Sequence, residues 1–144
     1  MIIDPKDEVL YGLRLAREHL EAAIKRMGVG DLAGSVEASQ LAAENSVKAV
    51  IAHFSTPSWS HDPSGELLEY VGSLPDELKH LVERLAEIVA DLAPEHGRAS
   101  YRIPERRITP SQIYDAEKAG RAVKLAEEAL KLVEQVLKGL GYDD

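Results

Sequence analysis

The stretch from Asp31 to Phe54 constrains the fold of this chain most. It reads DLAGSVEASQLAAENSVKAVIAHF, without proline and with Gly34 as its only glycine. As a helix it would span about 35 Å, at about 1.5 Å per residue. Its apolar residues recur at three- and four-residue steps: Leu32, Val36, Ala43, Val47, Val50, Ile51 and Phe54. Apolar residues on more than one side predict a helix inside a bundle rather than at its rim.

One polar stripe interrupts this helix, formed by Glu37, Gln40, Glu44 and Lys48. Glu44 and Lys48 are four residues apart, in the order that stabilises a helix. The stripe has two interpretations: a groove that faces a ligand, or an edge that is hydrated or contacts a second copy. We favour the edge, because rows of charge on helices are usually solvated.

The remaining sequence has helical periodicity and no strand pattern. Asp4-Pro5 is typical of a helix start, and the short connection Gly28-Val29-Gly30 predicts antiparallel neighbours on either side of it. We therefore predict one domain over residues 1–144, an all-α antiparallel four-helix up-and-down bundle with a short extra helix between helices two and three. The predicted helices cover about 5–27, 31–54, 64–71, 75–92 and 115–138.

Composition excludes several functions. The chain has no cysteine, hence no disulfide or thiol nucleophile. No apolar run is long enough to span a membrane, and MIIDPKDE lacks the features of a signal peptide, so we expect a cytoplasmic protein. The net charge of -8, from 17 basic and 25 acidic residues, opposes bulk nucleic-acid binding. One Trp and one Phe argue against a stacking platform for single strands.

Three motifs, in order, resemble the HEPN family (higher eukaryotes and prokaryotes nucleotide-binding). The first is Gln40-Leu41-Ala42-Ala43-Glu44-Asn45 followed by Lys48-Ala49, which resembles the core of the family's second helix. The second is Ser60-His61-Asp62 followed by Leu67-Leu68. The third is Tyr101-Arg102-Ile103-Pro104, followed by Pro110 to Tyr114. The resemblance implies an antiparallel four-helix bundle with a short extra helix, usually homodimeric.

The resemblance also bears on catalysis. Many members of the family are ribonucleases marked by Arg-x(4–6)-His near the start of the last helix. Here no His follows His96, so Arg102, Arg106, Arg107 and Arg121 have no such partner. Arg14 and His19 fit the spacing but lie in the first helix. Members without the motif are thought to bind nucleotides, or to pair with a minimal nucleotidyltransferase as a toxin–antitoxin or regulatory module.

An arginine-rich segment is the best local candidate for a ligand site. Arg98, Arg102, Arg106 and Arg107 lie close together in an irregular stretch, 95–113, beside one acid, Glu105. Guanidinium groups suit phosphate because they donate paired hydrogen bonds and stay charged, and Tyr101 and Tyr114 offer rings that stack on a base. The alternative, which we favour, is that these arginines pin the segment to acidic helices.

The histidines give weaker candidates. His61-Asp62 combines a base with a carboxylate, but Asp62 before Pro63 is also typical of a turn. His53 lies near the expected C-terminal end of a helix, where an imidazole interacts favourably with the helix dipole. His80 and His96 have no partners at zinc-ligand spacing, and Gly28-Val29-Gly30 lacks the Lys-Ser/Thr of a phosphate loop. We expect no metal and no cofactor.

Three functions remain open, the last of which is a structural helical dimer without a ligand. The first is a HEPN-like homodimeric interaction module that binds a nucleotide or a minimal nucleotidyltransferase. The second is a metal-independent ribonuclease with a degenerate site, for which Arg14, His19 and His61 are the candidate catalytic residues. The missing motif favours the first, and thus a protein that is not an enzyme. We also expect a second copy to cover part of the small-residue surface of 31–54.

Overall fold

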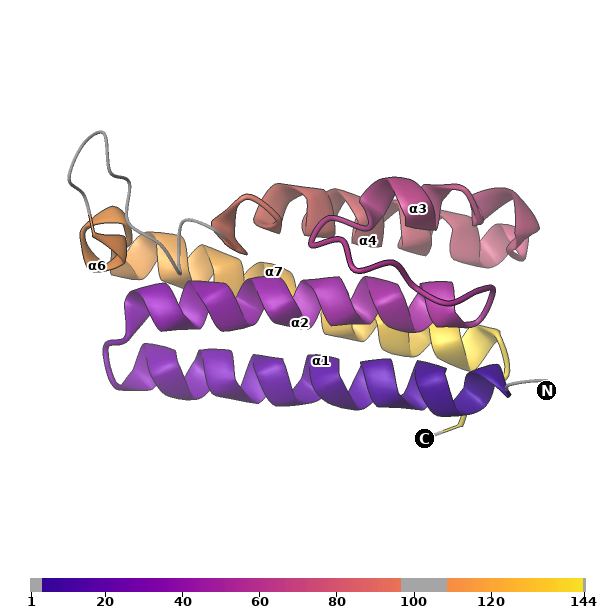
Figure 1. Cartoon of the computed structure of the whole chain (residues 1–144), viewed down its shortest axis with the longest axis horizontal. Helices are drawn as coiled ribbons and strands as arrows, with labels where there is room; N and C mark the ends of the chain where they lie inside the picture. Colours follow the sequence, from indigo (N-terminus) through magenta and orange to yellow (C-terminus); the bar gives the residue numbers. More distant parts are fainter. Residues whose placement is uncertain (1–3, 97–108, 144) are drawn as a thin grey trace.

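The computed structural model describes residues 4–96 and 109–143. Within them the fold is all-α, as predicted, and four long helices dominate it (Figure 1). These are α1 (Pro5–Gly28), α2 (Leu32–Ala52), α4 (Asp76–Leu92) and α7 (Ala116–Gly139). They lie side by side and alternate in direction along the chain. None of the described helices is both long and apolar enough to cross a membrane.

Aspartates begin three of the long helices. The Oδ1 atom of Asp4 accepts a hydrogen bond from the backbone N–H of Lys6 at 2.9 Å. Asp31 does the same for Gly34 at 3.0 Å, and Asp115 for Lys118 at 2.8 Å. Each carboxylate satisfies a backbone donor that the helix leaves free, and its charge complements the helix dipole. The boundaries of these helices are therefore encoded locally.

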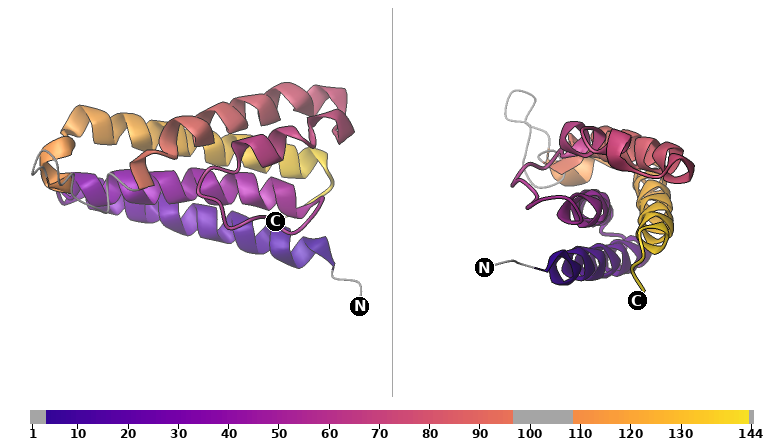
Figure 2. Two further views of the ribbon diagram at one scale, coloured as in Figure 1. Left: turned by 45° about the horizontal axis from the view of Figure 1, so that its top comes forward. Right: turned by 90° about the vertical axis from the view of Figure 1, so that its right-hand side faces the viewer.

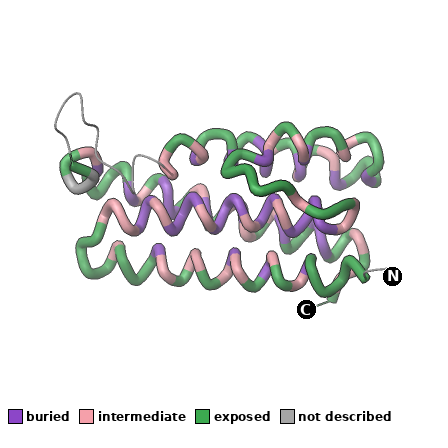
Figure 3. Tube along the Cα trace, in the orientation of Figure 1, coloured by how far each residue is buried: buried purple, intermediate pink, exposed green. Residues whose placement is uncertain are grey.

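Helix α2 is the centre of the fold. It contacts α1, α3, α4, α6 and α7, and the right-hand view of Figure 2 shows α1, α4 and α7 packed around part of it, with no helix on the remaining side. Along its length most residues are buried or half-buried (Figure 3); its serines are completely buried, and so are all of its alanines except the half-buried Ala33 and the nearly buried Ala38 and Ala52. Most small residues of α2 are thus covered by α1, α4 and α7 of the same chain, so their burial does not require a second copy, and homodimerisation stays a prediction.

Two short segments differ from the predicted boundaries. The helix expected over 64–71 is shorter, α3 (Ser64–Leu68), and a separate 3₁₀ turn, η1 (Val71–Ser73), follows it. Part of the stretch expected to be irregular is also helical, as α6 (Pro110–Ile113). Thr109 explains this helix, because its hydroxyl and backbone form a reciprocal capping box with Gln112.

Candidate functional site

Two buried polar side chains of α2 form the base of the candidate site. Gln40 is completely buried, and Glu44 is 5% exposed. They lie one helical turn apart on the same face, and the Nε2 atom of Gln40 donates a hydrogen bond to Oε1 of Glu44 at 3.0 Å. Buried polar groups need partners, so these two residues require further polar side chains from elsewhere in the chain.

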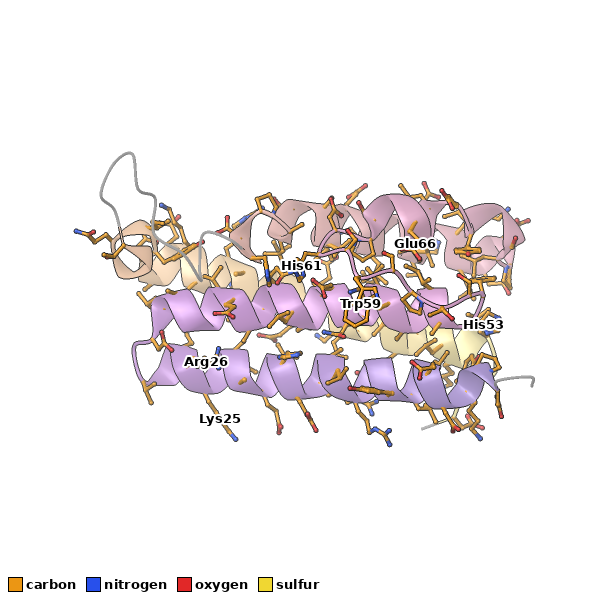
Figure 4. All side chains as sticks on the ribbon, in the orientation of Figure 1. Lys25, Arg26, His53, Trp59, His61 and Glu66 are labelled. Carbon is orange, nitrogen blue, oxygen red and sulfur yellow. The ribbon has the colours of Figure 1, made fainter. Side chains whose placement is uncertain are left out.

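Two histidines from distant segments supply those partners. His61 comes from the segment between α2 and α3, and its Nδ1 lies 2.9 Å from Oε1 of Glu44. His96 follows the end of α4, and its Nδ1 lies 3.1 Å from Oε1 of Gln40. Figure 4 shows His61 between α2 and α4. We call the group formed by Gln40, Glu44, Lys48, His61 and His96 the polar cluster.

The two imidazole rings of the polar cluster stack on each other. Their centroids are 3.6 Å apart, and their planes differ by 20°. A carboxylate and an amide carbonyl oxygen only accept hydrogen bonds, so Nδ1 carries the hydrogen on both His61 and His96. In the neutral rings this leaves Nε2 with its lone pair, and within the described residues neither Nε2 has a hydrogen-bond partner.

The charges in the polar cluster are balanced around Glu44. Burial raises the pKa of Glu44, but hydrogen bonds from Gln40 and His61 and the charge of Lys48 outweigh it, so the pKa lies below its ordinary value. The Nζ atom of Lys48 is 3.1 Å from Oε2 of Glu44. Glu44 is therefore ionised at neutral pH and is a permanent acceptor for His61.

His19 of α1 lies close enough to the polar cluster to feel the charge of Glu44. Burial is the largest influence on its pKa and lowers it below 6.5, against the opposing carboxylates of Glu18 and Glu44. Arg14, which together with His19 fits the Arg-x(4–6)-His spacing, is exposed. Five positions separate the two residues, which places them about 140° apart around a helix. The structure does not bring Arg14 and His19 together.

The segment that carries His61 also presents Trp59 to solvent. Trp59 is the chain's one tryptophan, and 96% of its surface is exposed. Figure 4 shows it in front of α2, farther along the helix than His61. We call residues 55–63 the Trp59 loop. A tryptophan is highly buried on average, so this position is unusual for a ring with no binding role.

Hydrogen bonds order the Trp59 loop on both sides of the tryptophan. The backbone N–H of Ser58 donates to Oε1 of Glu66 at 3.3 Å. Oδ1 of Asp62 accepts from the N–H and the hydroxyl of Ser64, at 3.2 and 2.6 Å, which is the turn role that sequence indicated for Asp62. Pro63 is buried. The exposure of Trp59 is thus built into an ordered segment.

Most of the predicted phosphate-binding residues lie outside the described residues: Arg98, Tyr101, Arg102, Arg106 and Arg107. Tyr114 is described and is 7% exposed, with its hydroxyl donating to the carboxylate of Glu95. Its ring therefore packs in the core rather than facing solvent. A hollow of about 220 Å³ beside it is smaller than ordinary ligand pockets, and its Arg121 is paired with Asp91 at 2.6 Å.

The prediction for the polar stripe was wrong for two of its residues. Gln40 and Glu44 were expected at a hydrated or dimer-contacting edge, but the Trp59 loop and His96 cover them. The sequence contained one signal for this burial, a Gln and a Glu one turn apart within a run of alanines. Alanine side chains are too short to hold a neighbouring segment away from the helix, so the segment covers the Gln and the Glu as well. His96 was considered only as a zinc ligand, and its role in the cluster was missed.

His53, at the end of α2, has a structural role. Its Nδ1 lies 2.7 Å from the hydroxyl of Tyr142, which ties the end of α2 to the C-terminal tail. Burial lowers the pKa of His53 below 6.5. Within the described residues no group of three or more His, Asp or Glu side chains is arranged to hold a metal ion.

Comparisons with known proteins find a matching protein family and a similar solved structure. The family model of the HEPN domain matches residues 10–136. Among solved structures, TT1696 from Thermus thermophilus is similar, with 26% sequence identity and a TM-score of 0.65, over 88% of this chain and 96% of that one. No curated protein matches this chain.

Proposed function

Since this chain belongs to the HEPN domain family, we propose that it is a homodimeric interaction module whose binding surface is centred on Trp59. The observation that carries this proposal is the nearly complete exposure of Trp59 on an ordered loop. Tryptophan is among the residues that most often dominate the binding energy of protein interfaces. An exposed Trp that is held in place loses little conformational entropy when a partner covers it.

Other exposed apolar residues do not compete with Trp59 for this role. Tyr11, Ile24 and Leu68 are each about half exposed, and Val29 lies in the turn between α1 and α2. Single apolar residues of this kind are normal on protein surfaces. Trp59 differs because it combines a large ring, almost full exposure, and a loop whose hydrogen bonds fix its position.

The partner that the HEPN family suggests is a minimal nucleotidyltransferase, in a toxin–antitoxin or regulatory pair. A nucleotide is the alternative ligand, and Arg98, Arg102, Arg106 and Arg107, with Tyr101, are the residues we propose for its phosphates and base. We place the module in the cytoplasm, since a chain without cysteine suits a reducing compartment.

A ribonuclease is the second candidate, and one observation favours it. Glu44 holds Nδ1 of His61 at 2.9 Å, an arrangement that orients an imidazole for general-base catalysis through Nε2. His96 stacks beside it as a second proton carrier. The last helix has Arg121 but no histidine after it, so the composite Arg–His site of the family's nucleases is missing.

Co-expression with a minimal nucleotidyltransferase tests the proposal. Tagged wild-type protein, Trp59→Ala and the matched control Val29→Ser serve as baits, because both positions are exposed and apolar. We expect equal recovery of the partner with wild type and Val29→Ser, and at least tenfold less with Trp59→Ala. Equal recovery with all three baits contradicts the proposed surface.

Incubation with RNA separates the two candidates. The interaction module predicts no cleavage by the purified protein in the absence of metal ions. Cleavage that is lost in His61→Gln but kept in His80→Gln would instead establish the ribonuclease, because His80 is exposed on α4 and lies outside the polar cluster.

A further inference from the structure

Lysine and arginine are absent from a long part of the chain around Trp59. All 17 of these basic residues lie outside residues 49–78, a stretch that contains several acids: Asp62, Glu66, Glu69, Asp76 and Glu77. Lys48, which precedes the stretch, is paired with Glu44 at 3.1 Å. Lys79, which follows it, is paired with Asp76 at 2.9 Å. The part of the chain that carries the exposed tryptophan is therefore acidic, and carboxylates neutralise the lysines at both of its ends.

Two of these carboxylates lie close to Trp59. Oε1 of Glu66 accepts a hydrogen bond from the backbone N–H of Ser58, the residue before the tryptophan, at 3.3 Å (Figure 4). Asp62, three residues after the tryptophan, is exposed and accepts from the N–H and the hydroxyl of Ser64. These donors are uncharged, and within the described residues no lysine or arginine pairs with either carboxylate. The exposed ring is therefore bordered by two negative charges that no cation neutralises.

A hollow of about 420 Å³ lies at the start of the Trp59 loop, where the loop meets the first turn of α1 and the end of α2. This volume is within the range of about 300–1,000 Å³ that ligand sites occupy. Its walls are mostly apolar, formed by Pro5, Ala52, Phe54 and Pro57, and Glu8 is the acid among its lining residues. We call it the Glu8 hollow.

Contacts behind the Glu8 hollow hold its wall in place. Phe54 stacks on Tyr70, with ring centroids 4.6 Å apart and planes that differ by 6°. The hydroxyl of Ser55, which also lines the hollow, lies 2.7 Å from the hydroxyl of Tyr70. The backbone N–H of Ser55 donates to the carbonyl of Ile51 in α2 at 2.9 Å. The hollow is thus a formed feature of the surface, and a partner does not have to create it.

The Glu8 hollow matches a long basic side chain. Glu8 is exposed, and within the described residues it makes no ion pair. Lysine and arginine pack their aliphatic stems on apolar surface while the charged head reaches a polar group. Here the stem would lie against the prolines and Phe54, and the head would meet the carboxylate of Glu8. An apolar side chain would leave that carboxylate unused, and an acidic one would be repelled by it.

A second copy of this chain is a poor match for the same surface. Contact across a two-fold axis would set each acidic surface against its equal, and like charges across an interface oppose association. The net charge of -8 adds to this repulsion at low ionic strength. A different protein with a basic contact surface is complementary in charge, and such complementarity speeds association and excludes wrong partners.

We propose that the Trp59 surface binds a basic protein, which covers the indole ring with apolar side chains, sets lysines or arginines against Asp62 and Glu66, and places one such side chain in the Glu8 hollow. The inference rests on the proposed function, because it assumes that a partner contacts Trp59, and it adds the chemistry of that partner. It also assigns self-association of the chain to a different face.

Hexa-arginine is the probe for this chemistry, and the one tryptophan of the chain reports its binding. Titration of the isolated protein at low ionic strength, followed by the fluorescence of Trp59, gives the dissociation constant. We expect saturable binding that hexaglutamate does not reproduce. The double variant Glu8→Gln, Asp62→Asn should bind about fivefold more weakly, since exposed charges each contribute modestly. The matched control Glu83→Gln, Glu127→Gln removes the same charge from exposed positions of α4 and α7, and we expect a change below about twofold.

Two results overturn the proposal: no binding of hexa-arginine by the wild type, or equal weakening in the two double variants, which would assign the attraction to net charge. Circular dichroism checks the fold. If the first double variant does not fold, Glu8→Gln alone replaces it, and an unchanged dissociation constant there is equally contradictory. The nucleotidyltransferase is absent from this titration. Failure here rejects the basic partner but leaves the Trp59 surface, whereas equal recovery of the nucleotidyltransferase with Trp59→Ala rejects the surface itself.

Discussion

The side-chain oxygen of Gln40 accepts a hydrogen bond from His96 at 3.1 Å, while its nitrogen donates to Glu44 at 3.0 Å. One completely buried amide thus joins the end of α4 to the acidic residue that holds the Trp59 loop. In one orientation of the side chain, the amide nitrogen and the amide oxygen of Gln40 both form hydrogen bonds. This residue fixes the geometry of the whole polar cluster.

Replacement of Gln40 by Leu tests that role. The change keeps the volume of the side chain but leaves Nδ1 of His96 without its acceptor and removes one donor from Glu44. We expect the free energy of unfolding to fall by about 1–3 kcal/mol, measured by urea titration. The control is Asn45→Ala, because among the described residues the side chain of Asn45 bonds to the carbonyl of Leu41 in its own helix alone, and there we expect a change within about 0.5 kcal/mol.

A second prediction concerns the contact between α1 and α2. A Cβ atom added to Gly12 would lie 3.1 Å from both Cα and Cβ of Ala49. We expect Gly12→Val to reduce the free energy of unfolding by about 2–3 kcal/mol, since neither backbone can move freely. Gly120→Ala is the control: its Cβ would meet only Met27, at 3.8 Å, and alanine favours the helix by about 0.5–1 kcal/mol. Equal effects at both positions would contradict the close packing.

Stability should fall as the solution becomes acidic, in two steps. Burial lowers the pKa of His19 and of His53 below 6.5. As the pH falls below 6.5, the unfolded chain therefore takes up protons at these two histidines before the folded chain does, and the free energy of unfolding decreases. The pKa of Glu44 is lowered from 4.5 by its partners, against the effect of burial, so its contribution is lost below pH 4.5. Urea midpoints between pH 7.5 and 3 measure both steps. Midpoints that rise on acidification would contradict these assignments.

The helices were predictable because their signals are local. Asp4, Asp31 and Asp115 cap helices at the places that sequence indicated, since a capping carboxylate acts within three residues of itself. The end of the short helix was not predicted correctly. Leu67 and Val71 share helical spacing, but the chain tightens into η1 (Val71–Ser73) before the next helix.

The candidate site was only partly predictable because its contacts are distant in sequence. His61 was noticed through its neighbour Asp62, yet its partner is Glu44 of α2. His96 and Gln40 meet only after α4 has folded against α2, and no pattern within either segment indicates this pairing. Trp59 was counted as one of few aromatic residues, and its exposure depends on the path of a loop that periodicity does not describe.

The affinity of Trp59→Ala for a minimal nucleotidyltransferase tests the central claim most directly. Titration calorimetry gives the dissociation constant of that partner for wild type, Trp59→Ala and the exposed control Val29→Ser. The account predicts that Val29→Ser binds the partner as wild type does and that Trp59→Ala binds it about thirtyfold more weakly, the effect of losing about 2 kcal/mol. Circular dichroism should show that all three proteins keep their helices. No binding by wild type, or one dissociation constant shared by all three proteins, would contradict the account.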